Sequence, residues 1–431
     1  MIKRLLPSTD LFRNISTLVI GTFLAQLVPV LLQSVLRRMY PAEDFGILEV
    51  FISITGILMV VSALRFEVAV VLPEKRSDAV NLVFAGMFSS LFFNLLLLMV
   101  IILFEQAILQ MLNLENRHSF MLYYLPPAIF LFSTYQVFNY YLVRTKAYKD
   151  ISINKISRRI AEGSGQVLAG LAGKLTMGLI WGNMAGHIVN IAAGWWQMTH
   201  NGFDIKLFSL RKQWEMAYKY REYPLFNLIP ALLNAVCMHL PLLLVNSFYT
   251  PETTAHFGLA RLVLILPASI LTLSISQVLL QTISEKYREK QSFSGDLKKI
   301  LLMLGIMGAL MSILILLWAP KLFALYAGSE YYISGVYARI FVLGAAIKLV
   351  VSPVSSIFIP LKKIKLFSLW QAGYFVLISM LFFARSLDIF TFLGVYLVID
   401  LVAYGTLLIM IIMLTLRYER SLKETNNKKH E

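Results

Sequence analysis

Apolar stretches long enough to cross a bilayer alternate with short polar gaps along nearly the whole chain. A transmembrane helix needs roughly 20 mainly apolar residues. Twelve stretches meet this length approximately: 14–36, 46–72, 79–104, 119–142, 157–173, 176–198, 224–248, 255–281, 298–319, 332–360, 366–384 and 390–416. The pattern therefore predicts an all-α integral membrane protein with about 12 transmembrane helices.

Basic residues gather in every second gap. About 29 of the 39 lysines and arginines lie in the N-terminal segment, in alternate gaps and in the tail, against about six in the other gaps. This bias predicts that both termini face the cytoplasm. The net charge of +15 is spread over many loops, so we expect contact with anionic membrane lipids and no nucleic acid partner.

Two segments of the chain echo each other. Residues 40–46 and 249–258 each contain Tyr, Pro and Glu, and each ends in a Phe-Gly that opens the next span. We interpret the echo as a duplication of six spans, with lobes at 1–205 and 206–416 and a basic tail at 417–431. Parallel repeats with a substrate site between them are typical of transporters. The alternative is a hairpin that Pro and Gly favour in any case.

A few ionisable residues lie inside the predicted spans, where they are costly and usually face a cavity or a partner. They are the basic Arg65, Arg261, Arg339 and Lys348 and the acidic Glu49, Glu67 and Asp400. We predict that the basic group binds substrate and that the carboxylates couple transport to protons or sodium. For Arg261 and Arg339 the alternative is snorkelling to the interface, and for Glu49 it is an interfacial place. Arg65 could instead pair with Glu67 or with lipid headgroups, and Asp400 could form a helix-to-helix hydrogen bond. Glu162, near the inner end of its span, is interpreted as interfacial.

The spacing of these residues adds geometry. Glu49 and Arg261 each lie four residues after the Phe of an echo segment, so we predict that they line a common cavity. Glu49 and Glu67 are five helical turns apart and should share a helix face. Arg339 and Lys348 are nine residues apart, which places them on opposite faces of a straight helix.

Signatures of enzyme chemistry are missing from the sequence. It contains no phosphate-cradling glycine loop, one cysteine (Cys237), and six histidines without metal-ligand spacing. The gaps on the predicted outer side are too short to assemble a glycosyl-transfer site easily. We therefore expect a protein that is not an enzyme and holds no cofactor or metal.

Several segments resemble the Wzx-type polysaccharide flippases of the multidrug/oligosaccharidyl-lipid/polysaccharide exporter superfamily. In chain order they are Arg65–Pro73 with Asp78 and Ala79, Tyr220–Phe226 with Asn234 and Pro241, Leu266–Val278, Gly328–Tyr331, Ser352–Ser356, and Trp370 with Gln371. The matches cover nearly the whole chain in the order typical of that family. Tyr331 departs from the pattern, because some members have Trp there.

The resemblance implies two six-helix lobes, pseudo-symmetric around a central cavity. It also implies a multi-pass protein of the bacterial cytoplasmic (inner) membrane that moves undecaprenyl-diphosphate-linked oligosaccharide repeat units to the periplasmic leaflet. Such units build surface polysaccharides such as the O-antigen of lipopolysaccharide, together with a polysaccharide polymerase and a chain-length regulator. Cationic cavity residues would then pair with the anionic diphosphate.

Three other functions remain open at this point. A cation-coupled multidrug exporter of the same superfamily would need an acidic and apolar cavity. A polysaccharide polymerase or ligase would need a large outer loop, which the sequence lacks. A non-transporting scaffold would leave the charges inside the spans unexplained.

The orientation can be tested with reporter fusions. We expect a fusion at Glu115 to report the outer side and a fusion at Lys290 to report the inner side, because basic residues crowd only the second gap. Paired alkaline phosphatase and green fluorescent protein fusions measure this directly. Two fusions on the same side would contradict the predicted topology.

Overall fold

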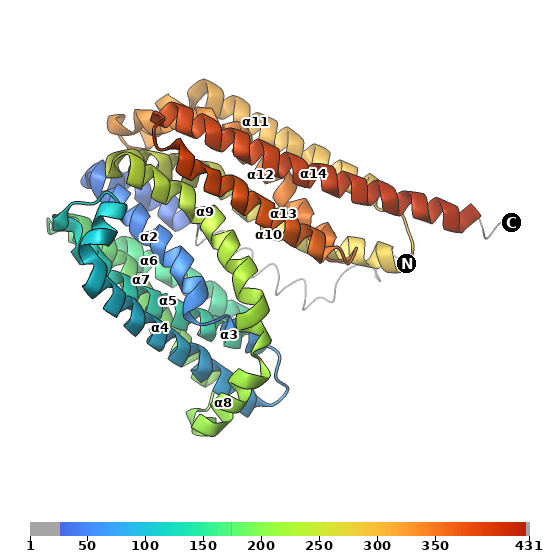
Figure 1. Cartoon of the computed structure of the whole chain (residues 1–431), viewed down its shortest axis with the longest axis horizontal. Coiled ribbons are helices and arrows are strands. Elements are labelled where there is room, and N and C mark those ends of the chain that lie inside the picture. Colours follow the sequence, from blue (N-terminus) through green and yellow to red (C-terminus); the bar gives the residue numbers. More distant parts are fainter. Residues whose placement is uncertain (1–25, 174, 428–431) are drawn as a thin grey trace. The chain divides into compact units, whose positions relative to one another are not determined.

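Helices dominate the computed structural model, which describes residues 26–173 and 175–427 (Figure 1). A helix through residues 26–39 is followed by α2 (Ala42–Ser62), α3 (Phe66–Ala69), α4 (Arg76–Met111), α5 (Phe120–Arg144), α6 (Tyr148–Leu171), α7 (Leu175–His200), α8 (Leu210–Lys219), α9 (Leu228–Phe248), α10 (Pro251–Arg288), α11 (Ser294–Ala327), α12 (Tyr332–Val354), α13 (Ile364–Ser379) and α14 (Ile389–Asn427). Within these residues there is no strand.

The observed helices follow the predicted spans closely from the third span onward. Seven helical segments of the described chain are long and apolar enough to cross a membrane. Helices α5, α6, α7 and α10 are of comparable length, with 24 to 38 residues each. The first predicted span, 14–36, lies largely outside the described residues.

The second predicted span, 46–72, is not one helix. Helix α2 ends at Ser62, and Leu64 and Arg65 take left-handed backbone angles, with φ of 52° and 61°. The short helix α3 and an irregular segment then lead to α4. Because the helix is interrupted, the prediction that Glu49 and Glu67 share one helix face is wrong.

The chain forms two compact units, Met1–Ala255 and His256–Glu431. In the first unit α2 packs on α9 and α5, α4 on α5, α5 on α7, and α6 on α7. In the second unit α11 packs on α12, and both α12 and α13 pack on α14. The lobe boundary expected after residue 205 stays a prediction.

The order in which helices pack against one another in the first unit recurs in the second unit. The pairs α4–α5, α5–α7 and α6–α7 correspond in chain order to α11–α12, α12–α14 and α13–α14. The two echo segments also play matching parts, since Pro41 caps α2 and Pro251 begins α10. A proline at a helix start loses no internal hydrogen bond. The recurrence agrees with the pseudo-symmetric lobes expected from the sequence.

Glycines allow α6 and α7 to approach closely. A Cβ on Gly182 would lie 2.6 Å from the backbone nitrogen of Gln166 and 2.8 Å from the backbone oxygen of Glu162. A Cβ on Gly186 would lie 2.9 Å from the backbone oxygen of Arg158. Small residues at such contacts let helix backbones pack without a hydrophobic driving force, as membrane helices must.

Large apolar side chains on other faces point outward. On α4, Phe92, Leu95 and Met99 are exposed, and on α11 Leu310 and Leu325 are exposed. Apolar faces of this extent would be an aggregation hazard in water. They are the expected surface of a helix that faces lipid.

The α6–α7 contact generates a stability prediction. Gly182→Ala should lower the melting temperature of the purified protein, because overpacking typically costs about 1–3 kcal/mol. Gly305→Ala on α11 is the matched control, since nothing lies within 4 Å of its new methyl group. Equal melting temperatures for the two variants in the same detergent would contradict the proposed close packing.

Candidate functional site

A polar pocket of about 110 Å³ lies where the second predicted span is broken. Its walls come from the end of α2, the turn into α3, and the middle of α5. The lining residues are Met59, Val60, Ala63, Arg65, Glu67, Ser133, Gln136, Asn139 and Tyr140. The break in the span thus places two of the predicted site residues, Arg65 and Glu67, at one cavity.

Arg65 is held from two sides. Its Nε donates to Asn227 Oδ1 at 2.9 Å, and its guanidinium lies 3.1 Å from Glu67 Oε1. Asn227 ends a π-helical turn, Tyr223–Asn227, that precedes α9. The Arg65 side chain keeps 23% of its surface exposed, against 7% for Glu67. Arg65 is therefore oriented by its neighbours while remaining accessible from the pocket.

The pocket also collects buried hydrogen-bond acceptors. Glu67 Oε2, Ser133 Oγ and Asn139 Oδ1 are buried and have no hydrogen-bond partner within the described part of the chain. Buried polar atoms are usually paired with protein or water. Three such oxygens around one cavity suit a molecule that supplies donors, such as the hydroxyl groups of a sugar or water.

Glu49 has a different environment from the one its position in the echo suggests. Its Oε1 lies 3.8 Å from the guanidinium of Arg37, whose side chain is fully buried. Arg37 also donates to Gln33 at 2.8 Å and stacks over the Phe45 ring at 4.2 Å. Glu49 therefore helps to neutralise a buried arginine in its own unit. A cavity shared with Arg261 stays a prediction.

Lys348 and Asp400, the two deepest candidates, form an ion pair in the second unit. Lys348 Nζ lies 2.7 Å from Asp400 Oδ2 and 3.2 Å from the Tyr396 hydroxyl. The Tyr374 hydroxyl donates to Asp400 Oδ1 at 2.9 Å. Asp400 is 2% exposed. The structure thus joins a predicted substrate residue to a predicted coupling residue.

Aromatic rings surround this pair. Lys348 Nζ lies 5.1 Å, 5.4 Å and 5.9 Å from the ring centroids of Tyr396, Tyr404 and Tyr374 respectively. Cation–π attraction at these distances adds to the ion pair. Gly344 on α12 admits the carboxylate, because a Cβ there would lie 3.1 Å from the Asp400 Cβ.

Arg339 faces another way. It donates to the Leu317 carbonyl of α11 at 2.8 Å, close to Pro320, which interrupts the hydrogen bonding of that helix. Lys348 faces α14, so the two lie on opposite sides of α12, as their spacing predicts. Arg339 therefore fastens α12 to α11. Arg261 is half-buried on α10.

A buried network in the first unit was missed by the sequence reasoning. Glu162 lies 3.0 Å from the Arg159 guanidinium and accepts from Asn183 at 2.8 Å, while Arg158 lies 3.3 Å from His187 Nε2. Glu162 is 8% exposed, so it is buried within the protein, and its interpretation as interfacial, which concerns depth in the membrane, stays a prediction. The four-residue spacings of Arg158 with Glu162, and of Asn183 with His187, were the available signal.

Comparison with solved structures identifies the class of fold. The chain is similar to an inward-facing multidrug resistance MATE family transporter of the MOP superfamily, with a TM-score of 0.70 and 11% identity over 93% of this chain and 96% of that chain. It is also similar to the lipid II flippase MurJ in an inward closed conformation, with a TM-score of 0.68 and 14% identity over 95% and 92%.

A third relative is a MOP superfamily transporter from Pyrococcus furiosus, described by the reverse polarity of its binding pocket, with a TM-score of 0.63 and 11% identity over 94% and 96%. At these identities the likeness shows the fold: two lobes of transmembrane helices, as the MOP transporters have. No curated protein matches the chain.

The family follows from the sequence itself. The profile of the family described as "Polysaccharide biosynthesis protein" matches residues 35–335, which is most of the chain. The chain belongs to this family. The family match and the MOP fold together confirm the resemblance drawn from the sequence motifs.

The ion pair between Lys348 and Asp400 generates a prediction about thermal stability. Lys348→Met and Asp400→Leu should each lower the melting temperature, because each leaves a buried charge without its partner at a cost of about 3–5 kcal/mol. The double variant should recover most of this loss, because it removes both charges. Thermal unfolding in detergent measures all three.

Additive losses in the double variant would contradict a direct pairing. Arg385→Gln, which removes an exposed charge on the same unit, is the control and should leave the melting temperature unchanged.

Proposed function

We propose that this protein translocates undecaprenyl-diphosphate-linked oligosaccharide repeat units from the cytoplasmic to the periplasmic leaflet of the bacterial inner membrane. The observation that carries the proposal is the polar pocket at the broken second span. The chain belongs to a polysaccharide biosynthesis family and has a transporter fold, which supports a sugar-bearing cargo for that pocket.

The pocket offers complementary groups for such a cargo. Arg65 supplies a partly exposed cation, and the buried oxygens of Glu67, Ser133 and Asn139 supply acceptors for sugar hydroxyl groups. A volume of about 110 Å³ suits part of one sugar, so the remainder of the oligosaccharide would extend beyond it. Charge-assisted hydrogen bonds to phosphate oxygens are about twice as strong as neutral ones.

The main alternative is a cation-coupled multidrug exporter, which the MATE likeness keeps open. A cationic drug would favour an acidic and apolar site. Glu67 already has Arg65 as its counter-charge, and the pocket walls are rich in hydroxyl and amide groups. The described pocket therefore suits a polar or anionic cargo better than a cationic one.

The driving force is part of the proposal. Glu49, Glu67 and Asp400 are the coupling candidates, and each lies beside a basic residue of its own unit. Protonation of a carboxylate would release its basic partner for an anionic cargo. Lys348 and Arg261 remain proposed cargo contacts. A polysaccharide polymerase and a chain-length regulator are the proposed partners that consume the product.

A reconstituted assay tests the function. We expect proteoliposomes containing the protein to move a fluorescent undecaprenyl-diphosphate oligosaccharide between leaflets, measured as accessibility to a membrane-impermeant quencher. Arg65→Gln should slow the movement about 10-fold, the loss expected for one charge-assisted contact. Arg385→Gln should transport at the wild-type rate, since its side chain is exposed and far along the chain from the pocket.

The assay also separates the alternatives. Transport of ethidium without movement of the glycolipid would favour the multidrug exporter. A well-folded Arg65→Gln variant with wild-type glycolipid movement would remove Arg65 from the proposed cargo site.

A further inference from the structure

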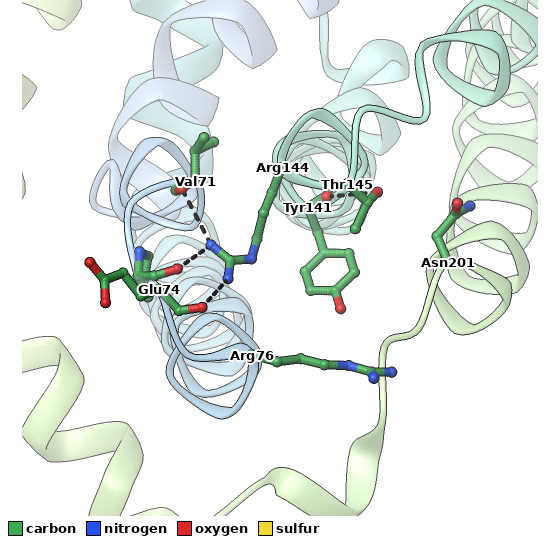
Figure 2. Close-up of a pocket in the computed structure, with 8 residues that line it drawn as sticks. Val71, Glu74, Arg76, Tyr141, Arg144, Thr145 and Asn201 are labelled. Carbon is green, nitrogen blue, oxygen red and sulfur yellow. Dashed lines mark hydrogen bonds between the residues drawn. The ribbon is translucent and has the colours of Figure 1, made fainter.

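A second pocket lies in the first unit, in the segment between α3 and α4. It is open and holds about 400 Å³. It lies between that segment, the C-terminal end of α5, and the turn after α7 (Figure 2). The basic bias of the gaps predicts that this end of the helices faces the cytoplasm. The pocket is separate from the one that contains Arg65.

Arg144 forms one side of this pocket. It donates to the backbone carbonyls of Val71 at 3.3 Å and Glu74 at 3.1 Å, and also to that of Pro73 (Figure 2). These three bonds engage three of the five N–H donors of the guanidinium, and carbonyl oxygens leave its positive charge without a counter-charge. Arg144 therefore fixes the chain segment and gives the pocket a positive potential.

Arg76 forms the opposite side. Figure 2 shows its side chain extending past the Tyr141 ring toward the turn that contains Asn201. Gly202 in that turn has a φ of 92°, and a Cβ there would lie 2.8 Å from an Arg76 guanidinium nitrogen. The glycine thus allows both the left-handed turn and the close approach of the arginine.

Neither arginine forms an ion pair with a carboxylate among the residues that the structure describes. Lys212 nearby differs, because it lies 2.8 Å from Asp78. Glu74 also lines the pocket, but its carboxylate points away from Arg76 (Figure 2). Two cations thus flank an open pocket with no acid between them.

We propose that this pocket binds the phosphate group of a lipid. The volume admits a phosphate or diphosphate, and a basic pocket between transmembrane helices at the cytoplasmic side is the arrangement that recognises anionic headgroups. Arg76 is the direct ligand, and Arg144 acts mainly by its field, because three of its five N–H donors are engaged with the backbone. The site does not depend on the proposed transport function.

Two lipids carry this chemistry: an anionic phospholipid of the cytoplasmic leaflet and a diphosphate-linked cargo. Binding to full-length protein in neutral detergent distinguishes them, with short-chain phosphatidylglycerol as one probe and inorganic pyrophosphate as the other. Binding of phosphatidylglycerol alone assigns the phospholipid, and binding of pyrophosphate assigns the diphosphate. The assay needs no transport, so its result is independent of the test of function.

Variants locate the binding. Arg76→Gln should weaken the Kd of the bound probe about 10-fold, and Arg76→Lys should recover part of the loss, because lysine keeps the charge without the planar fork. Arg211→Gln is the matched control, since Arg211 is a neighbouring exposed cation that pairs with Glu215 at 3.3 Å, and it should bind as the wild type does.

The proposal is overturned if neither probe binds below about 1 mM, or if Arg76→Gln binds as tightly as the wild type. A melting temperature measured for each variant ensures that a loss of binding is compared only among folded proteins. Arg144 is left intact in these tests, because its removal would leave three backbone carbonyls without this hydrogen-bond donor.

Discussion

The break in the second span imposes the constraint on which the rest of the first unit depends. Between Ser62 and Arg76 the chain is mostly not helical, so its backbone groups need partners that a helix would have supplied. Each unsatisfied group in an apolar medium costs several kcal/mol. Arg144 donates hydrogen bonds to three of these backbone carbonyls. Arg65, whose side chain donates to Asn227, lies at the turn where the helix is interrupted. Both described pockets exist because the span opens here.

A second regularity is that each of the three carboxylates inside the predicted spans lies beside a basic residue of its own unit. Glu49 lies beside Arg37, Glu67 beside Arg65, and Asp400 beside Lys348. An isolated charge in the membrane is far more costly than a pair with good geometry, so the pairs reduce the cost of keeping ionisable groups there.

The positions of the helices were largely predictable, whereas the pairing of charges on different helices was not. Length and apolarity alone located α4 to α7 and α9 to α14, because the apolar signal of these helices is continuous. The ends were less predictable, since α6 begins at residue 148 and not 157, and α14 ends at residue 427 and not 416. The short helix α8 was not predicted. The sequence contains no comparable signal for the break of the helix at Leu64 and Arg65. Neither residue is a glycine or asparagine, and apolar residues continue on both sides, so tertiary contacts such as that with Asn227 decide the turn.

The candidate site shows the same division. Depth in the span singled out Lys348 and Asp400, but they lie on different helices, and sequence separation contains no information about which charges meet. Arg144 was assigned to a cytoplasmic gap by the basic bias alone. Its bonds to the backbone carbonyls of Val71, Pro73 and Glu74 give the irregular segment hydrogen-bond partners that a helix would have supplied.

Paired charges also suit the reversible binding that a flippase requires. In a medium of low dielectric constant, an arginine without a counter-charge would hold a diphosphate too strongly to release it. A neighbouring carboxylate lowers the affinity, because the cargo must displace it from the same guanidinium. Under the proposed function, Glu67 would compete with the cargo for Arg65, and protonation of Glu67 would shift the competition toward binding. The pair that stabilises the empty site would therefore also set the affinity of that site for the cargo.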